Sequence, residues 1–487
     1  MKLKELCGDK ASLPQDATEI TGLTADSREV QPGYLFAALP GVQVNGARFV
    51  ADAVARGCAA VLAPVGLELD AALSVPVIHD ANPRRRLALM AARFYGRQPA
   101  TCVAITGTNG KTSVASFVRQ IWEAQDLFAA SMGTTGIAFN GEERSLGYTT
   151  PDPVSLHSQL TQLADRGVTH LAFEASSHGL AQHRVDGMKL AAGGFTNITR
   201  DHLDYHPSVD DYFAAKMRLF TELLAPGQPA IIDVDSQGGE QAAEMARARG
   251  LKLFTVGHNG DTLRLLSSER DGFAQTLCVS LEGVTYDVRV PLAGEFQAAN
   301  ALVAAGLAIA TGTPPEGVFR AVEHLKGAKG RLELAGYSPK RAAVFIDYAH
   351  TPDALENAIL ALRSFTSGRL QVVFGCGGDR DRGKRPQMGE VAARLADHVI
   401  VTDDNPRSED PAAIRAEILA AAPGATEIGN RTEAVSEAIA GLAEGDVLLI
   451  AGKGHETGQI VGNTVLPYSD HDSVAKVLLA LGGKVIG

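Results

Sequence analysis

A glycine-rich segment, TGTNGKTS at residues 106–113, carries the clearest chemistry in this 487-residue sequence. It follows an apolar run at 102–105 that is typical of a buried strand, and a helical pattern begins directly after it. Glycines in such a loop let backbone N–H groups converge on phosphate oxygens, and the helix N-terminus adds positive potential. A lysine there reaches the outer phosphates, and the next hydroxyl can ligate Mg²⁺. We expect ATP to be bound by Gly107, Thr108, Asn109, Gly110, Lys111, Thr112 and Ser113.

The loop is a shortened variant, because the strict G-x-x-x-x-G-K-[ST] pattern would place a glycine where this chain has Ile105. Two polar side chains near it favour catalysis. Glu174 ends the apolar run LAFEA, and His202 lies in TNITRDHLDYH, just after another predicted strand. Both should project from the carboxyl edge of the sheet that carries the loop. Carboxylate, imidazole and the Thr112 hydroxyl make a reasonable Mg²⁺ set.

A nucleotide-switch protein is the first alternative to an enzyme. It would be expected to carry a guanine-reading N-K-x-D motif, and no Asn in the chain is followed by Lys. A non-catalytic ATP-binding regulatory protein is a second alternative that the loop alone does not exclude.

The pattern of elements predicts an α/β protein with three domains. Residues 1–98 mix short strands at 35–41, 59–64 and 75–80 with a helix at 51–57, and a turn at 96–99 ends this part. In 99–329, apolar strands alternate with helical stretches, which indicates a largely parallel sheet covered by helices. Two helices close this part, at 295–312 and ending near residue 326.

After a hinge at 327–330 the alternation restarts in residues 330–487. Strands are predicted at 342–349, 371–378, 398–404 and 446–454, with helices between them. This is a second doubly wound unit, and such sheets bind ligands in the loops at the carboxyl ends of their strands.

Composition excludes several classes of protein. Lys and Arg total 45 against 56 Asp and Glu, a net charge of −11, so no nucleic-acid footprint is expected. The longest apolar run, 301–310, is too short for a membrane span, and the N-terminus has no apolar leader. Five scattered cysteines without a C-x-x-C pair suggest reduced thiols in a cytoplasmic protein, neither disulfide-linked nor zinc-binding.

Further motifs lie in order along the whole chain: DSR at 26–28, TTPD at 149–152, EASSHGLAQHRV from 174, GRLE at 330–333, DYAHTPD at 347–353, GGDRDRGKRP from 377, DNPR at 404–407 and GKGHE at 452–456. With TGTNGKTS and TNITRDHLDYH they resemble the Mur ligase family, the ATP-dependent amide-forming enzymes of peptidoglycan precursor synthesis. The resemblance implies a UDP-binding domain at 1–98, a central P-loop ATPase-like domain at 99–329 and a Rossmann-like, amino-acid-binding domain at 330–487.

The resemblance also implies roles for individual residues. Lys111, Glu174, His202 and Lys216 would be catalytic, with Lys216 carbamylated and ligating metal together with Thr112, Glu174 and His202. ATP contacts beyond the loop would be Asn300, Arg331 and Asp347. The UDP-muramoyl-dipeptide would be held by Ser27, Val42, Gln43, Val44, Thr149, Thr150, Ser176, Gln182 and Arg184. The acceptor amino acid would be held by Arg380, Asp404, Asn405, Pro406, Arg407, Gly452 and Glu456.

Less specific interpretations stand beside these roles. A lone Ser or Thr is often a helix cap. A helix lysine such as Lys216 is usually solvated. Arg380, Lys384 and Arg385 crowd one loop, which predicts either a locally basic site or a solvated surface. Tyr148 departs from the family, in which a polar Asn often precedes the paired threonines.

The implied reaction uses ATP and Mg²⁺. The D-Glu side-chain carboxylate of UDP-N-acetylmuramoyl-L-Ala-D-Glu forms an acyl phosphate, which the amine of meso-diaminopimelate then attacks, with no covalent protein intermediate. The alternatives within this resemblance are a lysine-adding ligase and, more distantly, a folylpolyglutamate synthase; the EASSHG and DHLDYH segments favour the muramoyl substrate. We expect a monomer.

Overall fold

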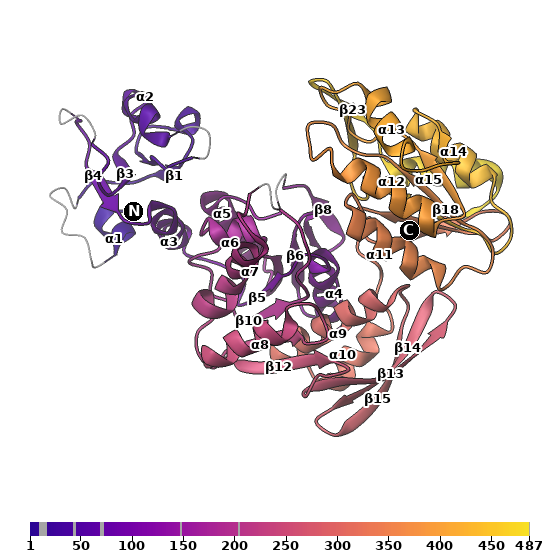
Figure 1. Ribbon diagram of the computed structural model, residues 1–487. Helices are drawn as coiled ribbons and strands as arrows, with labels where there is room; N and C mark the ends of the chain where they lie inside the picture. Colours follow the sequence, from indigo (N-terminus) through magenta and orange to yellow (C-terminus); the bar gives the residue numbers. More distant parts are fainter. Residues whose placement is uncertain (9–16, 42–44, 69–72, 147–148, 203–204, 487) are drawn as a thin grey trace. The chain divides into compact units, whose positions relative to one another are not determined.

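The computed structural model describes residues 1–8, 17–41, 45–68, 73–146, 149–202 and 205–486 (Figure 1). The chain divides into two compact units. The first contains Met1–Lys111, Trp122–Thr255 and Gly306–Thr313, and the second contains Thr112–Ile121, Val256–Ala305 and Pro314–Gly487. This division is coarser than the three predicted domains, whose boundaries stay predictions.

The N-terminal part of the first unit is a small parallel sheet. Its strands β1 (Gly22–Thr24), β2 (Tyr34–Ala37), β3 (Ala60–Pro64) and β4 (Val77–Asp80) pair in sequence order. The helices of this part are α1 (Leu3–Cys7), α2 (Val50–Ala55) and α3 (Pro83–Tyr95), with short 3₁₀ turns at Ser27–Glu29 and Gly46–Phe49. The three strands and the helix predicted here are therefore present, each slightly shorter than expected.

The larger sheet of the first unit places the phosphate loop at its centre. Its strand β5 (Thr101–Thr106) lies between β10 (Ala192–Phe195) and β9 (His170–Glu174), parallel to both. Outside these lie the parallel strands β11 (Pro229–Asp233) and β6 (Ala129–Gly133), and β7 (Gly136–Phe139) and β8 (Glu142–Arg144) continue from β6 with antiparallel pairing. The carboxyl ends of β5, β9 and β10 therefore meet at one edge, as predicted.

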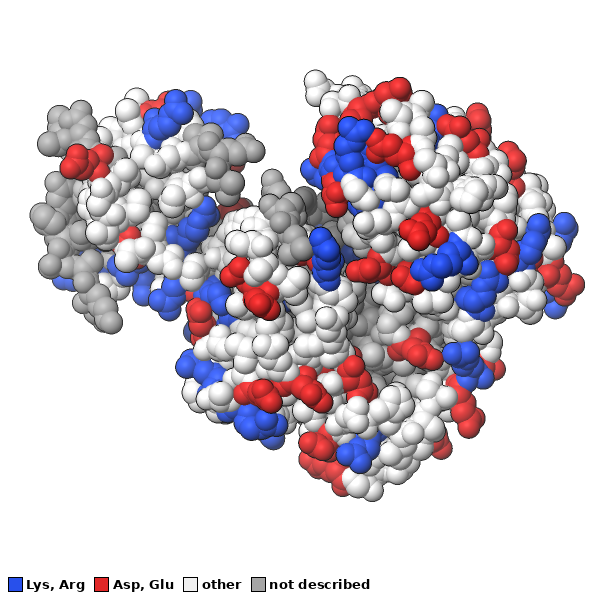
Figure 2. All heavy atoms as spheres, in the orientation of Figure 1, with Lys and Arg blue, Asp and Glu red and all other residues white. Residues whose placement is uncertain are grey.

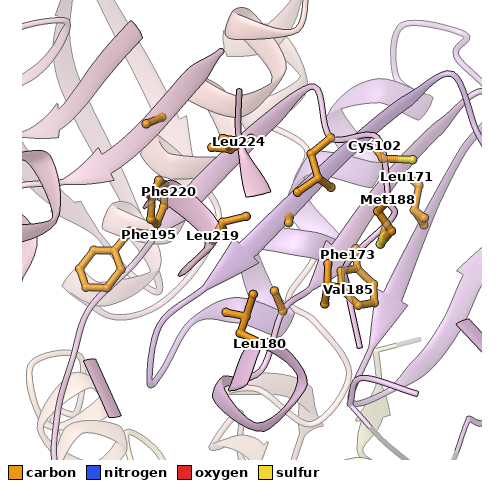
Figure 3. Packing of buried hydrophobic residues seen from close by; sticks show 14 of the residues in the cluster. Cys102, Leu171, Phe173, Leu180, Val185, Met188, Phe195, Leu219, Phe220 and Leu224 are labelled. Carbon is orange, nitrogen blue, oxygen red and sulfur yellow. The ribbon is translucent and has the colours of Figure 1, made fainter. Parts of the chain in front are cut away.

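Apolar side chains from this sheet and its helices form the core of the first unit. The helices include α5 (Pro153–Asp165), α6 (Ser177–Ala181), α7 (Val209–Arg218) and α8 (Gly239–Ala248), and α7 runs into a π-helical turn, η3 (Leu219–Leu223). Figure 3 shows Cys102 of β5, Phe173 of β9 and Phe195 of β10 among the packed residues, with Leu219 and Phe220 of η3. All five are fully buried, so close packing of this core holds the strands that carry the site rigidly in place.

Helix α4 (Lys111–Glu123) follows the phosphate loop, and strand β12 (Lys252–Gly257) leads into the second unit. There, β13 (Leu263–Asp271), β14 (Ala274–Leu281) and β15 (Val284–Val290) form an antiparallel meander, an element that the sequence patterns did not predict. Helix α9 (Glu295–Ala310) matches its prediction, whereas α10 (Pro315–Val322) ends before the predicted limit near Lys326.

The C-terminal part has a seven-stranded sheet in the order β20-β19-β18-β21-β17-β16-β24. Its strands are β16 (Glu333–Tyr337), β17 (Ala343–Asp347), β18 (Leu370–Phe374), β19 (His398–Val401), β20 (Thr426–Glu427), β21 (Val447–Ala451) and β24 (Lys484–Val485). The strands β17 to β21 pair in parallel, while β16 pairs antiparallel to β17 and β24. Alternate residues of β18 enter two different apolar clusters, Val372 and Phe374 in one and Val373 in the other. Both faces are therefore covered, as in a doubly wound sheet.

The covering helices are α11 (Pro352–Arg363), α12 (Lys384–Leu395), α13 (Pro411–Leu419), α14 (Arg431–Ala440) and α15 (Asp470–Leu481). A separate hairpin, β22 (Gly458–Val461) with β23 (Thr464–Pro467), follows the GKGHE motif. Among the described helices, none is long and apolar enough to cross a membrane. The five cysteines, all of which lie in described segments, form no disulfide.

Candidate active site

The phosphate loop is held in shape by the segment that follows β10. The Thr108 N–H donates to the Asn197 carbonyl at 2.9 Å, and the Asn109 N–H donates to the Asn197 side-chain oxygen at 3.0 Å. Gly107 has φ +149°, and a Cβ there would lie 1.9 Å from Thr196 Oγ1, so no other residue fits without displacing this segment. The loop is therefore preorganised by its own sheet, with helix α4 beginning at Lys111.

Two lysines converge on the loop. Lys111 Nζ donates to the carbonyls of Gly107 at 2.9 Å and Thr108 at 2.7 Å. Lys216, from α7, donates to the same Gly107 carbonyl at 2.6 Å and lies over the Tyr212 ring, 4.3 Å from its centroid. The Tyr212 hydroxyl donates to Thr108 Oγ1 at 3.2 Å. Helix α7 therefore contributes directly to the end of the sheet where phosphate binding is predicted.

Lys216 is 1 % exposed, so its ammonium is not solvated. Burial, reinforced by repulsion from Lys111, holds the pKa of Lys216 well below its ordinary value. The interpretation of Lys216 as a solvated helix lysine is therefore wrong. A lowered pKa populates the neutral amine, which is the form that reacts with carbon dioxide.

Glu174 sits at the carboxyl end of β9, beside the loop strand. Its carboxylate accepts hydrogen bonds from the Thr134 N–H at 2.9 Å and from Thr134 Oγ1 at 3.1 Å. A Cβ at Gly133 would lie 2.0 Å from Glu174 Oε1, so the carboxylate occupies space that only a glycine leaves open. Glu174 is 1 % exposed and is held in one orientation by these contacts.

The residues expected to hold the muramoyl-dipeptide form one network with Glu174. Thr134 Oγ1 is 3.0 Å from Thr149 Oγ1, and Thr150 Oγ1 donates to the Glu174 carbonyl at 3.1 Å. Ser176 Oγ is 2.9 Å from Thr150 Oγ1 and also caps helix α6. Arg184 donates to the Thr150 carbonyl at 2.7 Å and to Gln182 Oε1 at 2.8 Å. The structure brings together Thr149, Thr150, Ser176, Gln182 and Arg184, and their substrate roles stay predictions.

The remaining predicted substrate residues are less fully described. Ser27 is buried in the turn after β1. The described residues do not include Val42, Gln43 and Val44, nor Tyr148, the position that departs from the family pattern.

His202 lies in a cluster of aromatic rings at the same edge. Its ring centroid is 4.9 Å from that of His178 and 5.9 Å from that of Tyr212. The side chain is 43 % exposed, and φ +53° places its backbone in the left-handed region. Within the described ranges, no group of three or more His, Cys, Asp or Glu side chains is arranged to hold a metal ion. A Mg²⁺ site there would therefore also need hydroxyl or carbamate oxygens as ligands.

In the second unit, Arg331 connects the predicted nucleotide contacts. Arg331 donates to Thr112 Oγ1 at 3.4 Å, and its guanidinium lies 4.7 Å from the Tyr348 ring centroid. Asp347 accepts from the N–H groups of Leu332 at 2.5 Å and Ala349 at 2.7 Å. Burial raises the pKa of Asp347, partly offset by Arg331. Asn300, on α9, is buried and donates to Gln297, which contacts the Arg331 carbonyl.

The DNPR turn follows β19 and is tied to the hairpin β22–β23. The Arg407 N–H donates to the Ile460 carbonyl at 3.0 Å, and the Gly462 N–H donates to the Arg407 carbonyl at 2.7 Å. Arg407 has φ +52°, and its guanidinium donates to the Gly378 carbonyl at 2.8 Å. Gly452 packs beside Asp404, because a Cβ there would lie 2.7 Å from Asp404 Oδ2. The DNPR turn, with Asp404 and Asn405, thus adjoins the GKGHE turn, with Gly452 and Glu456, at one edge of the sheet.

The loop 377–385 is less basic than its sequence indicates. Arg385 is fully buried and paired with Glu409 at 2.8 Å and Glu417 at 2.9 Å. It joins the loop to α13, so its charge is neutralised internally. Arg380 and Lys384 remain at the surface, and Figure 2 shows positive and negative side chains interspersed over the face drawn. The expectation that Arg385 contributes to a locally basic ligand site was wrong.

Comparison with known proteins shows to which protein family this chain is related. Three family models match in order: "Mur ligase family, catalytic domain" at 19–95, "Mur ligase middle domain" at 105–308 and "Mur ligase, glutamate ligase domain" at 330–454. The chain belongs to the Mur ligase family. It is 55% identical over 98% of its length to a UDP-N-acetylmuramoyl-L-alanyl-D-glutamate–2,6-diaminopimelate ligase of Mesorhizobium japonicum, of which the match covers 99%. An enzyme of the same name from Agrobacterium fabrum is 56% identical over 96% of this chain and 95% of its own length.

Solved structures agree with the family assignment. A structure of a ligase with that same name aligns with TM-score 0.73 and 31% identity over 99% of both chains. A folylpolyglutamate synthase from Mycobacterium tuberculosis aligns with TM-score 0.61 over 76% of this chain and 92% of its own, at 21% identity, which shows a shared fold. The α/β architecture with parallel sheets is therefore that of Mur ligases.

Sequence reasoning missed residues that act through others. Thr134 orients Glu174 with two hydrogen bonds, and it follows a buried strand within the pair Thr134-Thr135, a signal of the same kind as the threonine pair at 149–150. Lys453, inside GKGHE, is fully buried. A charged lysine is expected at the surface, so no local pattern signals that Lys453 is buried.

Proposed function

We propose that this Mur ligase joins meso-diaminopimelate to the D-Glu side-chain carboxylate of UDP-N-acetylmuramoyl-L-Ala-D-Glu at the expense of ATP. The names of the curated relatives, which share more than half of their residues with this chain, support both substrates. The observation that carries the proposal is the hydrogen-bonded network from Thr134 through Glu174 to Thr150, at the sheet edge where β5 ends in the phosphate loop. It joins the expected dipeptide contacts to Glu174, the expected metal ligand, on the strand beside the one that ends in the loop.

In the first step, an oxygen of the D-Glu carboxylate attacks the γ-phosphorus of ATP. The bond from this phosphorus to the β,γ-bridging oxygen breaks, ADP leaves with that oxygen, and an acyl phosphate forms. Negative charge spreads over the transferring group, and the loop N–H groups together with Lys111 counter it. Lys111, now bonded to the carbonyls of Gly107 and Thr108, is placed to exchange them for phosphate oxygens.

In the second step, the neutral amine of the acceptor attacks the acyl carbon. The bond from the acyl carbon to the phosphate oxygen breaks, inorganic phosphate leaves, and the extra proton on the nitrogen passes to the departing phosphate or to water. An acyl phosphate is already reactive, so the protein mainly positions the two reactants. Thr150, Ser176 and Arg184 would hold the dipeptide, because they supply hydroxyls and a guanidinium at the same strand ends.

Bound Mg²⁺ would offset the charge of the ATP phosphates. The side chains present fit a Mg²⁺ ion. Glu174 supplies a carboxylate that Thr134 holds in place. Thr112 supplies a hydroxyl, and His202 supplies an imidazole. A carbamate on Lys216 would add an oxygen ligand, and the buried environment of Lys216 supports this modification. These ligands are proposals.

The acceptor is proposed to bind at the DNPR and GKGHE turns. Diaminopimelate carries a second carboxylate at the end where lysine has only its ammonium group, and Arg407 can pair with that carboxylate bidentately. A lysine-adding activity is the alternative. The protein's cytoplasmic location and monomeric state remain predictions from the sequence.

The test is phosphate release from ATP by the purified protein in the presence of UDP-N-acetylmuramoyl-L-Ala-D-Glu and a panel of amino acids. Release should require both the UDP-dipeptide and an amine, and meso-diaminopimelate should give the highest kcat/KM. Release that is highest with L-lysine would replace the acceptor assignment. Failure of every combination to release phosphate, with ATP still bound, would favour the regulatory alternative.

A further inference from the structure

Lys453 is the buried cation of the acceptor-side turns. Its side chain is 0 % exposed, and it lies two residues beyond the end of β21. Its Nζ donates to Glu456 Oε2 at 2.8 Å and to Asn405 Oδ1 at 3.0 Å. A buried ammonium is costly unless it is paired, so these two partners account for its presence there.

Asn405 completes a three-residue cluster with Lys453 and Glu456. Its Nδ2 donates to Glu456 Oε2 at 2.9 Å, so a single carboxylate oxygen receives two hydrogen bonds. Asn405 Oδ1 accepts from Lys453 and also from the Ile460 N–H at 2.9 Å. The cluster therefore ties the DNPR turn, the GKGHE turn and strand β22 together.

The two carboxylate oxygens of Glu456 differ in their hydrogen bonding. Oε2 is occupied by Lys453 and Asn405, whereas no described side chain or backbone N–H donates to Oε1. The Glu456 side chain is 30% exposed, although Lys453 behind it is fully buried. One oxygen is thus fixed from within the protein, and the other can meet a ligand at the surface.

We propose that Lys453 is a positioning residue for the acceptor amino acid. It holds Glu456 in one orientation so that Oε1 accepts a hydrogen bond from an ammonium group of the acceptor, and it keeps Asn405 beside that contact. Lys453 does not touch the acceptor, because its side chain has no exposed surface. The proposal rests on the proposed function, since it assumes that Glu456 faces the acceptor.

The alternative is a buried ion pair that only stabilises the C-terminal sheet. Such a pair should affect folding and all partial reactions alike. A positioning residue should instead affect the acceptor step selectively, because acyl phosphate formation needs only ATP and the UDP-dipeptide. This difference separates the two roles.

The test compares Lys453→Met, Glu456→Gln and the double variant with the unmodified protein. Steady-state kinetics give KM and kcat for meso-diaminopimelate, and positional isotope exchange within ATP, with UDP-dipeptide and no acceptor, reports acyl phosphate formation. Lys453→Met should raise the acceptor KM at least ~10-fold, as expected when a buried charge partner is removed. Isotope exchange should stay within about 2-fold of the unmodified protein.

The double variant tests whether Lys453 acts through Glu456. In the Glu456→Gln background, adding Lys453→Met should change the acceptor KM by less than about 2-fold, because the shared interaction is already lost. Asp446→Asn is the matched control: Asp446 is a buried partner of Arg369 at 2.9 Å, at the opposite end of β21. It should lower stability without raising the acceptor KM.

An unchanged acceptor KM in folded Lys453→Met overturns the proposal. So does a double variant whose rise in acceptor KM equals the product of the two single rises. An isotope-exchange rate that falls by as much as the acceptor KM rises also overturns it. If Lys453→Met does not fold, Lys453→Gln, which keeps a neutral donor, is measured under the same criteria. Failure of the proposed function is distinguishable, because the unmodified protein would then release no phosphate with meso-diaminopimelate. The comparison is in that case made with the amino acid that the panel identifies.

Discussion

At the scale of the residue, Lys111 is the side chain on which phosphoryl transfer should depend most. Lys111→Ala removes a charge directed at the outer phosphates and should lower kcat at least ~10²-fold, the range seen when a transition-state stabiliser is lost. Lys111 is only partly buried and donates to two loop carbonyls, so the fold should survive its replacement. Phosphate release and circular dichroism check this, with the exposed Lys340→Ala as control. Near-normal turnover of folded Lys111→Ala would remove Lys111 from the mechanism.

Lys216 should carry a carbamate. The family resemblance implies the modification, and burial favours the neutral amine that it needs. Lys216→Ala should lose at least ~10²-fold in kcat and regain part of it with small carboxylates, which can occupy the vacated space. Exposed Lys476 on α15 offers a matched control as Lys476→Ala. Isotope-labelled bicarbonate should give one carbamate signal in the unmodified protein and none in Lys216→Ala; a bare amine at saturating carbon dioxide contradicts the prediction.

Arg407 should decide between diaminopimelate and lysine. Losing a charge-assisted pair in a desolvated pocket costs on the order of 2–5 kcal/mol, so Arg407→Ala should lower kcat/KM for diaminopimelate ~30-fold or more. Activity with lysine should change little, because lysine has no carboxylate at that end. Competition assays with both amino acids measure the preference. Arg394→Ala on α12, which breaks an exposed pair with Glu356, is the control. Equal kcat/KM for both amino acids in the unmodified protein would refute the assignment.

At the scale of the element, the end of β11 contains a pH-dependent carboxyl. Burial raises the pKa of Asp233 to about 6 from 3.8. The folded state therefore binds this proton more tightly than the unfolded chain, so its stabilising contribution is complete below about pH 4 and is lost as pH rises through about 6. Asp233→Asn should remove this loss, worth on the order of 2–3 kcal/mol.

Urea unfolding at several pH values checks this prediction. The amide of Asn keeps an oxygen that can accept from the Asp235 N–H, as Asp233 does at 3.2 Å. Asp233→Asn should therefore gain stability relative to the unmodified protein between pH 4 and pH 6, with a constant difference above that range. A difference that is independent of pH would show that Asp233 titrates normally.

The elements were predicted unequally well for a physical reason. Strands β5, β9, β17 and β21 are continuous apolar runs because parallel sheets are covered on both faces, and such runs are conspicuous in a sequence. The meander β13–β15 is different: five of the last six residues of β13 are charged or serine, and all six are exposed. Its antiparallel pairing with β14 gives it order that its own residues do not signal.

At the scale of the whole molecule, the cysteines should behave as independent thiols. Cys7, Cys58, Cys102 and Cys376 are buried, and burial raises the pKa of Cys102 and of Cys376 to about 12. A thiol reagent should therefore react promptly only with the partly exposed Cys278 in the native protein and with all five thiols in denaturant. Reductant should leave the unfolding transition unchanged. A count below five in denaturant, restored to five only after reductant is added, would indicate a disulfide.

The sequence by itself determined the fold class, the family and the identity of the motif residues. The phosphate loop, the paired threonines and the DNPR and GKGHE turns are local, because each depends on a few residues that follow an apolar strand. Their order along the chain is enough to predict a ligase, and the matches over nearly the whole length confirm the family.

Only the tertiary structure decided which charges are buried and what they contact. Lys216, Arg385 and Lys453 are indistinguishable in sequence from solvated cations, yet each is fully or almost fully buried. Their partners come from distant segments: Gly107 for Lys216, Glu409 and Glu417 for Arg385, and Asn405 for Lys453. The free energy of a buried charge depends on such partners and on the loss of water around it, and both are set by long-range packing that no local pattern records.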